Sequence, residues 1–301
     1  MSELTIAGIY PPLPTFFTPE EELDLKTLQH HIQQLKDTGL AGYVALGSNG
    51  EAVHLTSEER ARVIEAVRVA AGESALLMVG CGDQSTRTTL AHCRLAAENG
   101  ADIALILPPF YYKSRMKHDA LLAHYLAVAD QSPLPLLIYN MPNNTGGLDL
   151  GAELVVELAQ HPRILGIKDS AGDIPKLAQI VAQAPADFKV MAGSAGYLLP
   201  ALQVGAVGAI SALANIFPRE VCHLQALFTS KALDEAERLQ ARLKPANTAV
   251  TATYSVAGLK AALEMIHGYG GVPRSPLLPL NDEESRYLSE VLQDLQLPIL
   301  D

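Results

Sequence analysis

The chain has 301 residues, 49% of them hydrophobic, a length that suits one large barrel domain or two domains of ordinary size. Its 22 basic and 33 acidic residues give a formal net charge of −11 without a basic cluster, so we expect no nucleic-acid partner. No apolar run is long enough to span a membrane, and the first residues lack the pattern of a signal peptide. We therefore expect a cytoplasmic protein with no membrane partner.

Cysteine and histidine offer no framework for a disulfide or a metal. The three cysteines, Cys81, Cys93 and Cys222, are odd in number and widely spaced, which is typical of a protein in a reducing compartment. The nine histidines are scattered and form no His-Glu-x-x-His pattern. We expect no metal site and no cofactor.

Strand-like apolar runs alternate with helical patterns through the first three quarters of the chain, which is typical of a parallel sheet. Eight such repeats predict a closed (β/α)8 barrel, the TIM barrel, rather than an open sheet. The first run is the weakest, because Pro11, Pro12 and Pro14 cannot donate to a strand ladder. The predicted strands cover residues 8–14, 42–46, 75–80, 102–107, 136–139, 164–168, 188–192 and 207–211.

Helices are predicted between these strands and after them. Thr56 and Glu59 form a capping-box pattern, and Gly72 lies where a left-handed residue ends a helix. After about residue 217 the strand signals stop, so we expect a barrel domain over residues 1–217 and a helical region packed on it over residues 218–301. The predicted helices include residues 23–38, 57–71 and 117–130 in the barrel, and 219–229, 232–243, 256–267 and 282–295 after it.

Lys168 closes the sixth predicted strand. A run such as 164–168 (ILGIK) belongs inside a parallel sheet, where an ammonium group is costly unless it is paired or neutralised. Barrel enzymes carry their catalytic groups at the C-terminal ends of the strands, and a neutral lysine there is a nucleophile for a carbonyl carbon. The alternative is a structural lysine that reaches solvent or forms an ion pair, for example with Asp169.

Tyr139 ends the preceding strand, which places it roughly 5 Å from Lys168 across the sheet. A phenol can donate and accept in turn the protons that Schiff-base chemistry moves. Taken alone, Tyr139 is better explained as a half-buried side chain that supports the rim of the barrel.

Three more segments follow strands at the same face of the predicted barrel. The turn 47–51 (GSNGE) lacks the ending of a phosphate-binding loop, but its Ser48 and Asn49 side chains suit a carboxylate or a proton relay. A plain tight turn is the alternative for this segment. Tyr111 and Tyr112 follow the fourth strand, and the seventh strand is followed by Gly193, whose backbone can approach a small substrate closely.

Four of these segments together resemble the dihydrodipicolinate synthase and N-acetylneuraminate lyase family in their order and spacing. They are residues 47–51 (GSNGE), 109–112 (PFYY), 139–146 (YNMPNNTG) and 166–170 (GIKDS), and the resemblance extends from residues 6–12 (IAGIYPP) to residues 258–260 (GLK). It implies a homotetrameric barrel with a helical C-terminal region. It also implies a lysine that forms an imine with the keto carbon of pyruvate or another 2-oxo acid.

The resemblance implies a role for each of these residues. Lys168 corresponds to the Schiff-base lysine and Tyr139 to the proton shuttle. Tyr111 looks like the relay tyrosine that family members donate across a tight dimer interface, with Tyr112 as the alternative.

The same resemblance implies which residues hold the substrate. Ser48 corresponds to the hydroxyl of the proton relay, and Asn49 to the position beside it that helps hold the carboxylate of the 2-oxo acid. The remaining positions that line the family's substrate site are Ser170, Gly193 and Ile210.

Asn144 separates the subfamilies. Dihydrodipicolinate synthases carry an arginine in the segment that reads PNNTG here, and an amide cannot give the bidentate contact with which that arginine binds the aldehyde substrate. The pair Ser48 and Asn49 also replaces two threonines of those synthases. The motifs are more similar to the 4-hydroxy-2-oxoglutarate aldolases.

The resemblance therefore implies a class I aldolase that releases pyruvate and glyoxylate from 4-hydroxy-2-oxoglutarate, with a small 2-oxo acid as its partner. Dihydrodipicolinate synthase, and an aldolase or dehydratase of 2-keto-3-deoxy sugar acids, are the alternatives among lyases. A metal-dependent aldolase is disfavoured by the scattered histidines. The alternative outside enzymes is a 2-oxo acid binding protein, although such a protein needs no proton relay.

Overall fold

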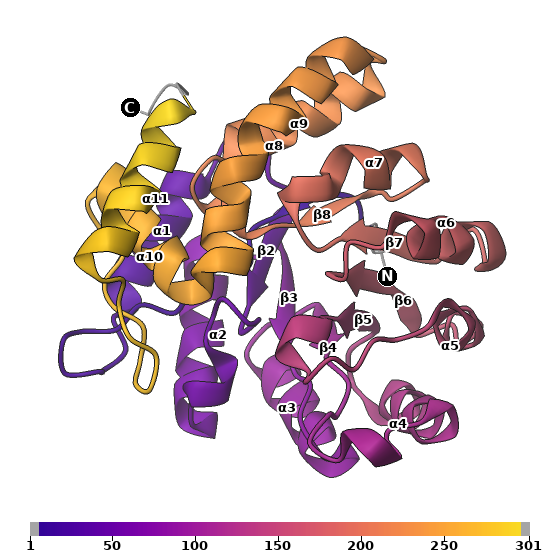
Figure 1. Cartoon of the computed structure of the whole chain (residues 1–301). Coiled ribbons are helices and arrows are strands. Elements are labelled where there is room, and N and C mark those ends of the chain that lie inside the picture. The colour runs from indigo at the N-terminus through magenta and orange to yellow at the C-terminus, as the bar shows by residue number, and fades with distance from the viewer. Residues whose placement is uncertain (1–5, 296–301) are drawn as a thin grey trace.

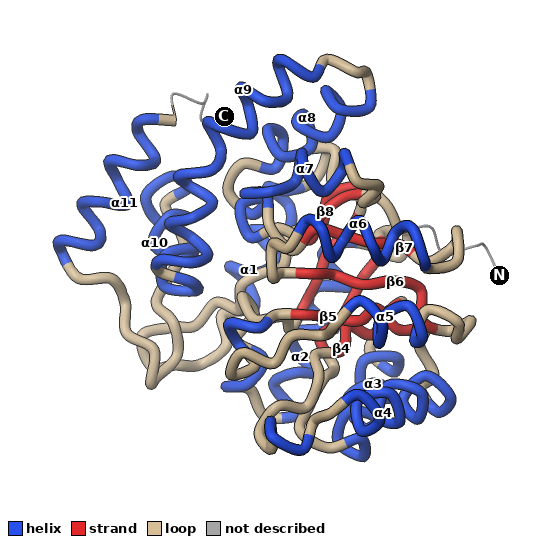
Figure 2. Tube along the Cα trace, turned by 45° about the vertical axis from the view of Figure 1, so that its right-hand side comes forward, coloured by secondary structure: helices blue, strands red, loops and turns tan. Residues whose placement is uncertain are grey.

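The computed structural model describes residues 6–295 as eight parallel strands surrounded by helices (Figure 1). Neighbouring strands follow the order β1-β8-β7-β6-β5-β4-β3-β2, so the predicted (β/α)8 barrel is confirmed. Figure 2 shows the strands enclosed by the helices. The strands are β1 (Gly8–Tyr10), β2 (Gly42–Ala45), β3 (Leu76–Gly80), β4 (Ile103–Ile106), β5 (Leu136–Asn140), β6 (Ile164–Asp169), β7 (Lys189–Ala192) and β8 (Gly208–Ile210).

The barrel closes between β1 and β2 by a few backbone hydrogen bonds rather than by a regular ladder of strand pairing. The first strand was expected to continue to residue 14, but β1 ends at Tyr10 where the prolines begin. Beyond it, Pro12 bridges to Val44, and the Leu13 amide donates to the Val44 carbonyl over 2.8 Å. A proline has no amide hydrogen, so regular pairing cannot continue along this segment.

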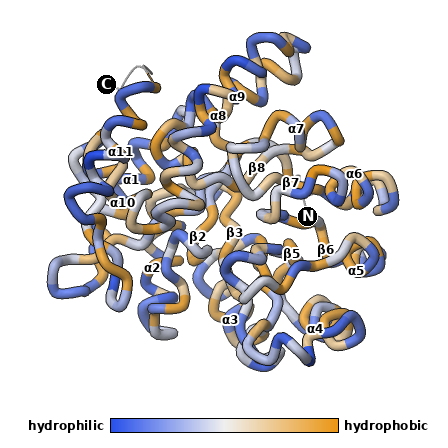
Figure 3. The backbone as a smooth tube through the Cα atoms, in the orientation of Figure 1, coloured by the Kyte–Doolittle hydropathy of each residue, from blue (hydrophilic) through white to orange (hydrophobic). Residues whose placement is uncertain are grey.

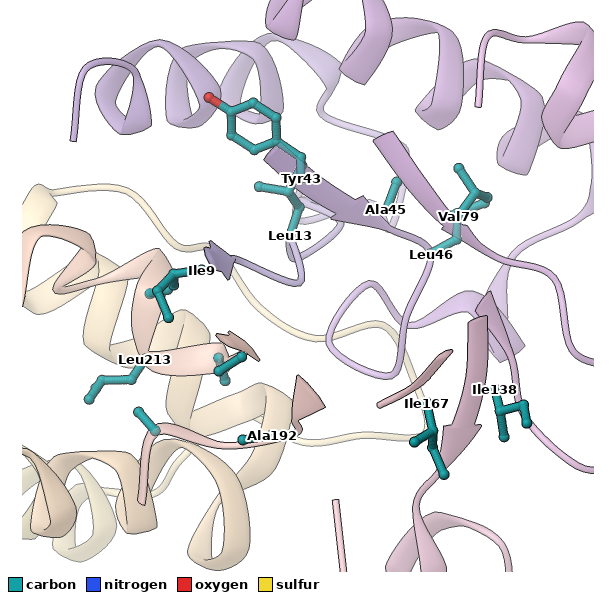
Figure 4. Packing of buried hydrophobic residues seen from close by; sticks show 14 of the residues in the cluster. Ile9, Leu13, Tyr43, Ala45, Leu46, Val79, Ile138, Ile167, Ala192 and Leu213 are labelled. Atoms are coloured by element: carbon teal, nitrogen blue, oxygen red, sulfur yellow. The ribbon is translucent and has the colours of Figure 1, made fainter. Parts of the chain in front are cut away.

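Apolar side chains fill the space inside the barrel and a second space between strands and helices. Alternate residues of β5 show this, because Leu137 and Tyr139 belong to the inner cluster whereas Ile138 belongs to the outer one. Figure 4 shows Ile138 and Ile167 among the residues of the outer cluster. Figure 3 shows hydrophobic residues along the strands and many hydrophilic residues on the surrounding helices. Consequently Tyr139 faces the barrel interior.

The helices follow the predicted pattern closely. The capping box of Thr56 and Glu59 is present at the start of α2, and Gly72 has a positive φ of 87° at its end. The helices are α1 (Leu25–Leu35), α2 (Ser57–Ala71), α3 (Thr86–Glu98), α4 (His118–Gln131), α5 (Ala152–Leu158), α6 (Ile174–Gln183), α7 (Leu198–Gln203), α8 (Pro218–Thr229), α9 (Leu233–Thr248), α10 (Ser255–His267) and α11 (Asp282–Asp294). None of the described helices is long and apolar enough to cross a membrane.

The last helices gather beside the barrel, as Figure 2 shows for α9, α10 and α11. Helix α8 packs on β1 and α7, and α9 packs on α8 and α11. Helix α9 was expected to end at residue 243, but it continues through Pro245 to Thr248 and is followed by a π-helical turn, Ala249–Thr253. Such wide turns often occur at functional sites. The division of the chain at residue 217 stays a prediction.

Candidate active site

Lys168 and Tyr139 lie side by side inside the barrel. They are directly paired in the register of β5 and β6, and both side chains point inward. The Lys168 amine lies 3.9 Å from the centroid of the Tyr139 ring, and each residue is only 3% exposed. The electron-rich face of a phenol ring stabilises a nearby cation without a formal charge. The pairing expected from the strand ends is therefore present.

Asp169, the alternative partner of Lys168, is bonded to other groups. Its carboxylate accepts hydrogen bonds from the Asn140 amide over 2.7 Å and from the Ala171 backbone over 2.9 Å. It also forms an ion pair of 2.8 Å with Lys176. Burial lowers the pKa of Lys176, but the charge of Asp169 and the bonds to it and Asp149 outweigh this effect and raise that pKa.

The Lys168 amine has no carboxylate partner among residues 6–295, because none of the ion pairs in that part of the chain includes it. A buried lysine is usually paired, so a buried lysine without a carboxylate partner is unusual. Lys168 therefore forms no ion pair with Asp169, so that structural interpretation is wrong. Its burial also excludes a side chain that reaches solvent.

Ser48 lies next to the hydroxyl group of Tyr139. Its hydroxyl lies 3.3 Å from the Tyr139 hydroxyl, and either group can be the donor. The turn that carries Ser48 is fixed at Gly50, whose carbonyl accepts from the Thr15 hydroxyl over 2.7 Å. It is also fixed at Glu51, which is buried and bonded to the Lys260 amine of α10 over 2.6 Å. The serine hydroxyl is thus held at the mouth of the barrel.

These residues line a cavity of about 390 Å³ at the C-terminal ends of the strands. This volume is in the ordinary range for a small-molecule site. The residues that surround the cavity are mostly polar and neutral. They include Ser48, Asn49, Tyr139, Asn143, Asn144, Lys168, Ser170, Gly193, Ser194, Tyr197, Lys244, Asn247, Thr248, Thr251 and Ser255.

A second cavity of about 660 Å³ adjoins the first one and shares part of its wall. Ser48, Tyr139, Asn144 and Ser255 line both. Away from the shared residues, Phe110 and several leucines line the second cavity together with charged or titratable side chains, namely Glu51, His54, Arg60, Asp83 and His92. Ser48 and Tyr139 therefore lie where the two cavities meet.

Gly193 and Ser170 face each other across the ends of β6 and β7. A Cβ atom at Gly193 would lie 1.9 Å from the Ser170 Oγ, so only glycine fits at this position. The Ser170 hydroxyl is buried but has no hydrogen-bond partner. A buried hydroxyl without a partner costs free energy, and a bound ligand can supply the missing bond.

Ile210 and Tyr111 differ in position from the other predicted site residues. Ile210 is fully buried in the inner cluster of the barrel with Tyr139, and it does not line either cavity. Tyr111 is 76% exposed and packs edge to face on Tyr112, which is exposed as well. Neither tyrosine touches the site within one chain, which leaves both candidates for the relay role open.

Several residues of the site were missed in the sequence. Tyr197 donates to the Asp169 carbonyl over 2.7 Å and accepts from the Gly193 amide over 3.2 Å; burial raises its pKa. Lys244 and Asn247 lie on the part of α9 beyond its predicted end. Only an extension of the helical pattern through Pro245 could have indicated them. No group of three or more His, Cys, Asp or Glu within residues 6–295 is placed to hold a metal ion.

Comparison with known proteins identifies the family. The model of the dihydrodipicolinate synthetase family matches residues 5–295. The chain belongs to this family. It is 40% identical over 293 residues to the "Probable 4-hydroxy-2-oxoglutarate aldolase, mitochondrial" of Emericella nidulans, covering 96% of this chain and 94% of that protein. It is 38% identical to the L-threo-3-deoxy-hexylosonate aldolase of Hypocrea jecorina, covering 95% of each chain.

Solved structures agree with this assignment. A dihydrodipicolinate synthase of Bacillus anthracis superposes with a TM-score of 0.93 at 28% identity, covering 98% of this chain and 100% of that one. A family member from E. coli in complex with pyruvate gives a TM-score of 0.91 at 27% identity, with the same coverage. The chain is therefore a lyase, an aldolase of the dihydrodipicolinate synthetase family, and the interpretation as a mere binding protein is not needed.

Proposed function

We propose that this protein is a class I aldolase in which Lys168 forms an imine with a 2-oxo acid. The observation that carries the proposal is the inward-facing Lys168 amine, which is buried, unpaired with any described carboxylate and 3.9 Å from the Tyr139 ring. A relative from E. coli whose structure contains pyruvate supports the class of substrate. An amine in this environment is well placed to attack a carbonyl carbon.

The reaction begins when the Lys168 amine adds to the keto carbon, and the carbinolamine then loses water to give a protonated imine. Tyr139, which has given its own proton to the departing water, now removes the proton of the hydroxyl on carbon 4. The bond between carbons 3 and 4 breaks, and the electron pair of that bond enters the imine to form an enamine. The fragment with carbon 4 leaves as an aldehyde. Protonation of carbon 3 and hydrolysis release pyruvate and free Lys168.

Ser48 and Asn49 have two parts in this proposal. The Ser48 hydroxyl, 3.3 Å from the Tyr139 hydroxyl, passes the proton between Tyr139 and the reacting groups. Asn49 lines the same cavity and holds the carboxylate next to the keto group, together with the unpartnered Ser170 hydroxyl. Uncharged donors of this kind suit a carboxylate that lies beside a cationic imine.

We assign 4-hydroxy-2-oxoglutarate as the substrate, which gives pyruvate and glyoxylate. The relative from Emericella nidulans supports this choice by its name. Asn144 supports it as well, because this residue lines the cavity with an amide instead of a guanidinium group. A dihydrodipicolinate synthase is therefore the less favoured assignment.

A 3-deoxy sugar acid is the second candidate substrate. The relative from Hypocrea jecorina is named for such an acid. The hydroxyl and amide groups of Ser194, Asn247, Thr248 and Thr251 on the cavity wall suit the hydroxyls of a sugar chain.

Reduction with borohydride in the presence of pyruvate tests the imine. The expected product is a covalent adduct on Lys168, found by peptide mass spectrometry, and Lys168→Ala should give no adduct while it remains folded. An unmodified Lys168 in folded wild-type protein would overturn the mechanism. Pyruvate release from 4-hydroxy-2-oxoglutarate, from 3-deoxy sugar acids and from the condensation partners of a synthase then decides between the substrates.

A homotetramer is the assembly that we propose, with Tyr111 donated to the site of a neighbouring subunit. The 76% exposure of Tyr111 supports this arrangement, because a large aromatic side chain is usually covered. Sedimentation should give a tetramer, and Tyr111→Phe should lower kcat whereas Tyr112→Phe should not. The opposite result would move the role to Tyr112. The cytoplasmic location stays a prediction, since the relative from Emericella nidulans is named mitochondrial.

A further inference from the structure

The lining of the catalytic cavity has a strong charge bias. Among the described residues that surround it, two are lysines, Lys168 and Lys244, and none is Asp or Glu. The chain as a whole has a formal net charge of −11, so this bias is local and opposite in sign. A positively charged cavity in a negatively charged protein attracts anionic ligands and raises their local concentration. The cavity is therefore suited to an anion with more than one charge.

Lys244 lies on α9, away from the strand that carries Lys168. Its side chain is exposed at the cavity, and its amine forms none of the hydrogen bonds or ion pairs found within residues 6–295. When Lys168 becomes part of an imine at the bottom of the site, Lys244 is the remaining lysine of the lining. A free ammonium group at the wall of a site is a point-charge partner for an oxyanion.

The end of α9 is held rigidly against the barrel. Asn247, one turn after Lys244, is 4% exposed, and its amide donates to the Ser194 hydroxyl of the β7 loop over 2.8 Å. A Cβ atom at Gly196 would lie 2.7 Å from the same amide, so the glycine allows this close approach. The Asn247 carbonyl accepts from the Thr251 hydroxyl of the π-helical turn. Lys244 is thus presented from a fixed surface rather than a loose loop.

We propose that Lys244 binds a second carboxylate of the substrate, at the end remote from the imine, and so selects 2-oxo dicarboxylic acids over 2-oxo acids with a neutral tail. The inference rests on the proposed function, because the imine at Lys168 fixes the other end of the substrate. Asn144 and Thr248 line the same cavity and supply further uncharged donors. A neutral sugar chain would gain no charge interaction from Lys244, so the lysine favours the dicarboxylate over the second candidate.

The experiment compares two ligands that differ only in the remote group. The compounds 2-oxoglutarate and 2-oxopentanoate have five carbons each, and the first ends in a carboxylate where the second ends in a methyl group. Isothermal titration calorimetry gives both dissociation constants for the full-length protein. We expect wild type to bind 2-oxoglutarate roughly tenfold more tightly, as suits one hydrogen bond to a charged group.

Lys244→Met should bring the ratio of the two dissociation constants close to one, through weaker binding of 2-oxoglutarate, whereas Lys244→Arg should keep the preference. Lys26→Met is the matched control, since it removes an exposed helical lysine of the same charge that lines neither cavity. It should leave the ratio unchanged. Lys244→Gln repeats the test if the methionine variant does not fold.

An unchanged ratio in folded Lys244→Met or Lys244→Gln, or a wild type without preference for 2-oxoglutarate, would overturn the inference. Failure of the proposed function gives a different result, namely no borohydride adduct on Lys168 with pyruvate. The preference for a dicarboxylate can be measured in either case, so the two failures are distinguishable.

Discussion

The Glu51 carboxylate and the Lys260 amine form an ion pair of 2.6 Å in which neither side chain is more than 1% exposed. The second carboxylate oxygen of Glu51 accepts from the Arg274 backbone over 2.9 Å. Burial lowers the pKa of Lys260, and the charge of Glu51 opposes that shift. The pair joins the turn that carries Ser48 to helix α10, so the proposed proton relay depends on a bond made outside the cavity.

Lys260→Met should reduce the free energy of unfolding by about 3–5 kcal/mol, because it leaves the buried Glu51 carboxylate without its cation. Urea unfolding measures the loss. The double variant Glu51→Gln/Lys260→Met should lose less than the single variant, since no charge remains buried. Glu157→Gln, which breaks the exposed pair of Glu157 with His118, is the control and should change stability by less than about 1 kcal/mol. An equal loss in the single and double variants would contradict the argument.

Tyr139→Phe should reduce kcat roughly 10²- to 10⁴-fold, because it removes the proton shuttle but keeps the ring beside Lys168. Ser48→Ala should have a smaller effect of the same kind. Steady-state kinetics with 4-hydroxy-2-oxoglutarate measures both. The Tm of each variant provides the control for folding, and activity of Tyr139→Phe equal to that of wild type would assign the proton transfer to another group.

Gly193→Ala should abolish binding of 2-oxo acids and destabilise the protein by about 1–3 kcal/mol, because the new methyl group overlaps the Ser170 Oγ and the Asp169 carbonyl. Gly151→Ala is the matched control, since a Cβ atom there meets nothing within 4 Å. Calorimetric binding of pyruvate and thermal unfolding measure the two effects. Tight pyruvate binding in Gly193→Ala would mean that the β6 and β7 ends lie farther apart than the structure gives.

Stability should decrease in mild acid because of His31. This residue is fully buried, and burial lowers its pKa to about 4, although a hydrogen bond with Asn215 opposes the shift. In the unfolded chain the imidazole takes up its proton near pH 6.5, so the unfolded state binds more protons between pH 6.5 and about 4. The contribution of His31 is fully present above pH 6.5 and is lost as the pH falls through this window.

The loss from His31 should reach roughly 3 kcal/mol at pH 4. Urea unfolding at several pH values measures it, and His31→Gln should make the dependence flatter. His118→Gln, at an exposed position, is the control and should leave the slope as in wild type. A slope that is the same in His31→Gln and wild type would contradict the assignment.

Much of the barrel and the centre of the site could be predicted from the sequence. The alternation of apolar runs with amphipathic ones is a local signal, and strand polarity then places Lys168 and Tyr139 at the same end of neighbouring strands. The capping box of Thr56 and Glu59 could also be predicted, because it depends on two residues that are close together in the sequence. These predictions depend on periodicity and on the geometry of parallel sheets, which do not require knowledge of distant contacts.

Other features depend on contacts between distant parts of the chain, so the local pattern did not indicate them. Lys260 has the spacing of an ordinary helix residue, but it is buried against the carboxylate of Glu51, far away in the sequence. Asn247 lies beyond residue 243, where the helix was expected to end, and it contacts the loop after β7. Ile210 points into the packed interior of the barrel, where a single strand residue gives no sign of its depth.

The contact between Asn247 and Ser194 has a consequence for how this protein can change over evolutionary time. Part of the binding wall is provided by the helices that follow the barrel, and part by the barrel loops. Exchange of the C-terminal helices with those of a relative would therefore alter substrate choice at once, without any substitution near Lys168. Recombination at the end of the barrel is thus a route to new specificity, whereas loss of the helices would leave Lys168 in a site without its outer wall.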